Sequence, residues 1–74
     1  MKTLEYDLTG LMCPIPVIRV NKKLNEMDSG DVIIATVTDP VACYDFPDFC
    51  RSTGHQFIGM RKDGDQFFFS IKRK

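Results

Sequence analysis

Cys13 is the side chain in this sequence whose type and position best suit covalent chemistry. It follows a turn at Gly10 and stands just before a predicted helix that begins at Pro14. The first turn of a helix carries unpaired backbone N–H groups and the positive end of the helix dipole, and both favour a thiolate over a thiol. The position therefore predicts a lowered pKa for Cys13 and a thiol that reacts as a nucleophile.

Pro14 and Pro16 are expected to shape the turn that presents this thiol, because proline fixes one backbone angle and is tolerated in the first turn of a helix. Cys13 could instead be a small buried hydrophobic residue, as free cysteines often are. Its place at a junction between loop and helix favours an accessible thiol, since such junctions usually lie at the surface.

Exchange between sulfur atoms is the chemistry we expect of Cys13. No general base stands beside it, and the single histidine, His55, opens a later strand. The end of a helix is sufficient to activate a thiolate for exchange with another sulfur. Hydrolysis would also need proton transfer and an oxyanion site, which disfavours a hydrolytic enzyme.

The sequence contains three cysteines, and an odd number without a signal peptide argues against a disulfide framework. Charges interrupt the first residues and no apolar run approaches a membrane span, so we expect a cytoplasmic protein with free thiols. The spacing Cys43-x6-Cys50-x4-His55 matches no common zinc pattern, so no metal site is expected. No cofactor is expected either, because sulfur exchanged at Cys13 would be held covalently. Cys50 should join the core beside Phe46 and Phe49, whereas Cys43 could be a resolving thiol or a plain loop residue.

The apolar periodicity predicts the order β-α-β-α-β-β. Strands are expected at residues 4–8, 32–38, 55–61 and 66–73, and helices from Pro14 to Met27 and from an N-cap at Asp45 to Gly54. Asp63-Gly64 predicts a hairpin between the last two strands. Two helices can cover only one face of four strands. The expected fold is a two-layer α/β (α+β) sandwich with a four-stranded mixed sheet, in a single domain over residues 1–74.

A basic face is expected on the first helix, where Arg19, Lys22 and Lys23 share helical spacing with Glu26. It could bind an acidic partner surface beside the thiol, with Arg19 as the best single candidate, or it could be a solvated helix face. Ten basic and ten acidic residues give a net charge of zero, which disfavours direct binding of nucleic acid. Alternation in the final strand leaves only Phe68 of three successive phenylalanines facing outward.

The element Gly10-Leu11-x-Cys13-Pro14-x-Pro16-Val17, with Arg19 after it, resembles the signature of the TusA-type (SirA-like) sulfur carrier family. The resemblance covers nearly the whole chain. It continues in Thr38-Asp39-Pro40, in Asp45-Phe46-Pro47-x-Phe49-Cys50, in Thr53-Gly54-His55 and in the final strand. It implies the same β-α-β-α-β-β sandwich and a motif cysteine, here Cys13, that accepts sulfur as a persulfide.

The resemblance also implies partners. Members of this family take sulfur from a cysteine desulfurase or a rhodanese-like donor and pass it to an acceptor protein, in one branch toward 2-thiouridine in tRNA. Ile15 stands where that branch often carries an acidic residue, so the motif leaves the donor and the acceptor open. We therefore expect a sulfurtransferase-type persulfide carrier that acts with partner enzymes. A thiol redox protein, which the lack of Cys-x-x-Cys disfavours, and a nucleic-acid-binding or regulatory module are the alternatives.

Overall fold

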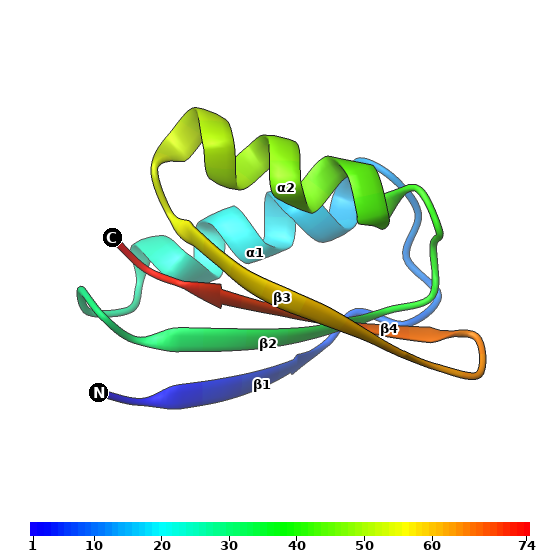
Figure 1. The fold of residues 1–74 in the computed structure, drawn as a ribbon, viewed down its shortest axis with the longest axis horizontal. Coiled ribbons are helices and arrows are strands. Elements are labelled where there is room, and N and C mark those ends of the chain that lie inside the picture. The colour runs from blue at the N-terminus through cyan, green and yellow to red at the C-terminus, as the bar shows by residue number, and fades with distance from the viewer.

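The computed structural model describes residues 1–74 and contains four strands and two helices in the predicted order. The strands are β1 (Thr3–Asp7), β2 (Val32–Val37), β3 (Gln56–Asp63) and β4 (Gln66–Lys72), and the helices are α1 (Ile15–Asn25) and α2 (Ala42–Thr53). The strands form one sheet in the order β1-β2-β4-β3, and both helices cover the same face of it (Figure 1). The predicted two-layer sandwich is therefore confirmed.

The sheet is mixed. β1 and β2 are parallel, whereas β4 is antiparallel to both of its neighbours, β2 and β3. Parallel neighbours need a crossover connection, which α1 provides, and antiparallel neighbours can be joined by a tight hairpin. Asp63 pairs with Gln66, so the hairpin turn consists of Gly64 and Asp65, one residue later than predicted. β3 accordingly extends beyond its predicted end at Arg61.

The core lies between the helices and the covered face of the sheet. Phe69 of β4 is fully buried, and its ring centroid lies 4.7 Å from that of Phe46 in α2. α1 contributes Val20 and Leu24, whose spacing places them on one face of the helix. Alternation turns Phe68 to the opposite face of the sheet, where the Arg61 guanidinium lies 4.5 Å from its ring. The other buried apolar residues are Leu8, Ile33, Ala35, Val37, Ala42, Phe49, Cys50, Phe67 and Ile71.

α2 begins at Ala42, whereas the sequence predicted an N-cap at Asp45. The earlier start is set by Asp39. Its Oδ1 accepts a hydrogen bond from the backbone N–H of Val41 (3.1 Å), and its carbonyl oxygen accepts one from Ala42 (3.1 Å). Pro47 consequently lies inside the helix and not in its first turn.

The other helix ends lie closer to the prediction. Gly54 ends α2 in a left-handed conformation (φ 88°), which favours glycine. α1 ends at Asn25, before the predicted Met27, because the N–H groups of Glu26 and Met27 donate to carbonyls only three residues earlier. Neither helix has the length and apolar character needed to cross a lipid bilayer.

Asp31, between α1 and β2, holds two chain segments together through its carboxylate. Its Oδ1 accepts a hydrogen bond from the backbone N–H of Lys2 (2.8 Å), and its Oδ2 accepts one from the backbone N–H of Asp28 (3.0 Å). These hydrogen bonds, that from Lys2 first, hold the pKa of Asp31 below its ordinary value. The ionised carboxylate therefore stabilises the folded chain.

Asp31→Asn should unfold at a lower urea concentration than the wild type at about pH 7, and the gap should shrink toward about pH 3. The reason is that a carboxyl with a depressed folded-state pKa contributes stability above its unfolded pKa, and this is lost as the pH falls through the folded-state pKa. Urea titrations followed by circular dichroism measure the gap at both pH values. Asp65→Asn, in the exposed hairpin turn, is the control. A gap that is equal at both pH values would contradict this role.

Candidate functional site

Cys13 lies in the connection between β1 and α1, and the backbone around it is fixed at several points. Gly10 adopts a left-handed conformation (φ 81°), and its N–H donates a hydrogen bond to Thr38 Oγ1 (2.9 Å). The peptide bond between Cys13 and Pro14 is cis, and α1 begins at the next residue with Pro16 in its first turn. The Cys13 side chain is exposed at the end of this connection.

The buried carboxylate of Asp39 ties the thiol-bearing connection to α2. Its Oδ2 accepts a hydrogen bond from the backbone N–H of Cys13 (2.7 Å), while its Oδ1 accepts the one from Val41 (3.1 Å). Asp39 is only 3% exposed, so water cannot readily replace either bond. Asp39 therefore links the position of Cys13 directly to the start of α2.

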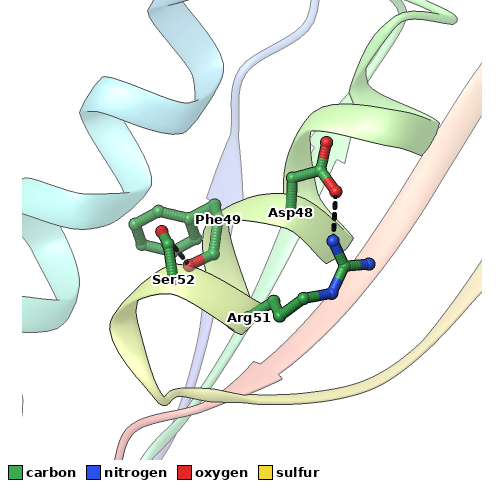
Figure 2. A network of polar contacts seen from close by, with 4 residues as sticks. All are labelled: Asp48, Phe49, Arg51 and Ser52. Carbon is green, nitrogen blue, oxygen red and sulfur yellow. Dashed lines mark hydrogen bonds and ion pairs between the residues drawn. The ribbon is translucent and has the colours of Figure 1, made fainter.

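The Cys13 thiol opens onto a groove with a volume of about 450 Å³. One wall comes from residues of α2 that recur at helical spacing, and the other comes from the beginning of α1. Figure 2 shows Phe49 and Ser52 on the side of α2 that is turned toward α1. The lining residues are Cys13, Pro14, Val17, Asp45, Asp48, Phe49 and Ser52. We call this hollow the Cys13 groove.

The charged residues of the Cys13 groove are both acidic. Asp48 forms an ion pair with Arg51 (2.7 Å) on the exposed side of α2 (Figure 2). Asp45 takes part in neither of the two ion pairs in the structure, and its carboxylate lies beside the Cys13 thiol. Asp45 is therefore a negative charge beside the sulfur that no ion pair offsets.

The pKa of the Cys13 thiol is raised above its ordinary value, so the lowered pKa predicted from the sequence is wrong. The largest cause is the neighbouring Asp45 carboxylate, which as a hydrogen-bond acceptor favours the S–H group over the thiolate. Partial desolvation and the negative charges of Asp45 and Asp39 act in the same direction. Each of these effects favours the protonated thiol.

The start of α1 offers few N–H groups to oppose that effect. Pro14 and Pro16 have no N–H, and the N–H of Ile15 already donates to the Met12 carbonyl (2.9 Å). The N–H of Cys13 itself is bound by Asp39. The start of α1 therefore offers a thiolate less stabilisation than the sequence predicted, and the spacing of the prolines is one local reason.

Asp45→Asn should increase the rate at which iodoacetamide alkylates Cys13 several-fold at neutral pH. Removing the negative charge lowers the pKa of the thiol and raises the thiolate fraction. The rate can be measured by intact-protein mass over a range of pH. Asp48→Asn should change it less, because the Asp48 charge is offset by Arg51. An unchanged pH profile in Asp45→Asn would rule out this control of the thiol by Asp45.

Arg19, Lys22 and Lys23 lie on a different part of α1 from the Cys13 groove. They line a separate hollow of about 350 Å³ with Tyr6 and Glu26, and none of them lines the Cys13 groove. The Lys23 ammonium lies 5.4 Å from the Tyr6 ring centroid and 3.5 Å from the Glu26 carboxylate. The basic face exists, but it is not part of the groove beside the thiol.

The other cysteines and His55 are placed differently from Cys13. Cys50 is 4% exposed, and burial raises its pKa to about 11. Cys43 is partly buried and packs against the core. His55 is buried, and its Nδ1 accepts a hydrogen bond from the backbone N–H of Lys74 (3.2 Å). None of the three lines the Cys13 groove.

Two acidic residues at the site were not among the residues predicted to act there. The sequence indicated Asp39 only as the end of a strand and Asp45 only as an N-cap, although both lie in segments that resemble the sulfur carrier family. The one signal in the sequence was that the family resemblance covers the segments of Asp39 and Asp45 together with the motif from Gly10 to Pro16. Only the packing of α2 against the start of α1 brings both carboxylates to Cys13.

Comparison with known proteins identifies relatives of this chain. Residues 4–73 match the family described as sulfurtransferase TusA. A sulfur carrier protein TusA of Allochromatium vinosum is 41% identical over 69 residues, which cover 93% of this chain and 91% of that protein. A putative sulfur carrier protein of Neisseria meningitidis is 38% identical over 74 residues, the whole of both chains. The crystal structure of a SirA-like protein from Desulfitobacterium hafniense has a TM-score of 0.80 at 30% identity and covers 97% of this chain and 96% of that one.

The fold and the site define a small α/β sandwich that presents an exposed thiol at the beginning of its first helix. The match over residues 4–73 and the identity of these relatives show that the chain belongs to the TusA sulfurtransferase family. Its role is that of a sulfur carrier, which by definition takes sulfur from a donor and gives it to an acceptor.

Proposed function

We propose that Cys13 carries the sulfur as a persulfide, which it accepts from a cysteine desulfurase or a rhodanese-like protein and passes to an acceptor protein. The observation that carries this proposal is the exposed Cys13 thiol, held by Asp39 at the edge of an open groove. Cys50 is buried and Cys43 packs against the core, so neither is as accessible to a partner. The sulfur carrier relatives support the same role.

Loading of Cys13 is a displacement at sulfur. The Cys13 thiol loses its proton to water, and the thiolate attacks the outer sulfur of the donor persulfide. A new S–S bond forms on Cys13 while the S–S bond of the donor breaks, and the donor cysteine leaves as a thiolate. Delivery repeats this displacement with the acceptor thiolate as attacker and Cys13 as leaving group. Every bond made or broken between heavy atoms is an S–S bond, so these steps require no resident cofactor.

The raised pKa of Cys13 affects the two steps differently. It lowers the thiolate fraction before loading, so the unloaded carrier reacts slowly with chance electrophiles. It also makes Cys13 a poorer leaving group, which slows the discharge of a loaded persulfide to unselected thiols. Both effects suit a carrier that should exchange sulfur only with a docked partner.

The sulfur donor and the sulfur acceptor are both proteins in this scheme. Arg19, Lys22 and Lys23 provide a second contact surface on α1, suited to an acidic region of the donor or acceptor. Sulfur delivered in this way can end in 2-thiouridine of tRNA or in another sulfur pathway, without direct contact between this chain and RNA. All three cysteines are free thiols, which fits a reducing compartment such as the cytoplasm.

Intact-protein mass after incubation with a cysteine desulfurase and cysteine tests the proposal. The expected result is a gain of one sulfur atom per chain that a reducing agent removes. A rhodanese with thiosulfate serves as the second donor, and Arg19→Ala should load more slowly from a protein donor that uses the basic face. Failure of every donor to load the wild type would refute the persulfide role of Cys13.

A further inference from the structure

The Cys13 groove has a mainly apolar surface and two acidic residues, Asp45 and Asp48, which we call its rim. Pro14, Val17 and Phe49 supply its apolar surface, and Asp45 and Asp48 supply its charges. No basic residue lines it, and Arg51 offsets only the charge of Asp48. A ligand that enters the groove therefore meets apolar contacts and one uncompensated carboxylate beside the Cys13 sulfur.

The charge of the rim selects among possible occupants. The phosphates of a nucleic acid would be repelled by Asp45 and Asp48, and an acidic protein segment would be repelled in the same way. A cationic side chain next to an apolar one complements both parts of the surface. The volume of about 450 Å³ suits a few side chains of an extended segment and not a folded element.

We propose that the Cys13 groove receives an extended segment of the sulfur-exchanging partner, in which a lysine or arginine lies next to the reactive sulfur and beside an apolar side chain. This inference rests on the proposed function, because the partner must bring its sulfur to Cys13. The cation meets Asp45, and the apolar side chain meets Val17 and Phe49. The basic face of α1 lies outside this contact and can meet a different, acidic part of the same partner.

Docking of this segment would also activate the thiol. In the free chain, Asp45 lines the same groove as Cys13, and its carboxylate favours the protonated thiol. Asp39, on the connection to α2, and Asp48, on α2, add negative charge on the same side, and the start of α1 contributes no charged residue to the groove. A cation that pairs with Asp45 offsets this field, so the thiolate forms when the partner sulfur is in place.

Two peptides that differ by one residue provide the probe. Each contains leucine and one cysteine, which is held as a mixed disulfide with thionitrobenzoate, and the residue before the cysteine is lysine in one peptide and glutamate in the other. The Cys13 thiolate attacks the peptide sulfur, a disulfide between Cys13 and the peptide forms, and thionitrobenzoate leaves as a coloured thiolate. Since the leaving group is the same, the ratio of the two rates reports the charge preference of the groove. A Cys43→Ser background removes the other partly accessible thiol.

The Lys peptide should react about 3- to 10-fold faster than the Glu peptide, the size expected for one charge pair near a protein surface. Asp45→Asn should bring the ratio of the two rates close to the ratio that free cysteine gives with the same peptides. In the Cys43→Ser chain with Asp45 intact, high salt should reduce the ratio. Asp65→Asn, in the exposed hairpin turn and outside the lining of the groove, should leave it unchanged. A ratio that is near that of free cysteine, or that Asp45→Asn does not change, would overturn the proposal. No persulfide takes part, so this result is independent of whether Cys13 loads with sulfur.

Discussion

Cys13→Ser should gain no sulfur under conditions in which the wild-type chain gains one sulfur atom, so the expected loss of loading is complete. Serine has nearly the same shape as cysteine, but its hydroxyl oxygen cannot form a persulfide. Cys13 is exposed and contributes nothing to the buried core, so the variant should keep the fold. Intact-protein mass before and after reduction measures the loading, and circular dichroism verifies the fold.

The matched control for Cys13→Ser is Cys43→Ser, which removes the next most accessible thiol. It should load to the same extent as the wild type. Cys50→Ser is less informative, because Cys50 is buried and its replacement places a hydroxyl in the core. If Cys13→Ser still gained sulfur and Cys43→Ser did not, the carrier would be Cys43, and the role proposed for Cys13 would be wrong.

Asp39→Ala should lower the free energy of unfolding by about 2–4 kcal/mol and slow the loading of Cys13 about tenfold. The substitution leaves the N–H groups of Cys13 and Val41 without the acceptors that now bind them at 2.7 and 3.1 Å. A hydrogen bond to a charged group contributes about 1.5–3 kcal/mol, and these two bonds are partly buried, so each should lie toward the lower end of that range. The thiol also loses its fixed position relative to α2, and displacement at sulfur depends on alignment of the reacting atoms.

Urea unfolding gives the stability of Asp39→Ala, and loading is then measured at a temperature at which the variant is folded. Thr38→Ala is the matched control, because it removes the more exposed hydrogen bond from Gly10 (2.9 Å) without touching Cys13. It should have smaller effects on both measurements. If Asp39→Ala loads at the wild-type rate while folded, Asp39 is structural and does not position the thiol.

The fold was predictable because its signals are local. Alternation in β2 and β4 and the apolar stripe of α1 indicated these elements. Two helices can cover only one face of a four-stranded sheet, which indicated a two-layer fold. Even Phe68, the outward residue among three phenylalanines, followed from alternation alone. The start of α2 differs from the prediction because an Asp-Pro pair is typical of the end of a strand, whereas here the side chain and the carbonyl of Asp39 also accept the first hydrogen bonds of the helix.

The chemistry of the site was only half predictable. The sequence indicated Cys13 as the presented thiol, because a cysteine at the start of a helix is a local feature. The direction of its pKa depends on Asp45, which lies far along the chain and reaches Cys13 only through the packing of α2 beside α1. A helix dipole can be inferred from one segment, but a carboxylate supplied by another element cannot.

The most direct test of the carrier role is the release of sulfur from loaded Cys13 to cyanide. A persulfide should yield one thiocyanate per loaded chain, and the protein should return to its unloaded mass, while Cys13→Ser should yield none. A gain in mass that cyanide does not remove would contradict the account. Such a gain would indicate oxidation of the thiol to a sulfinic acid, whose two oxygen atoms add nearly the mass of one sulfur atom.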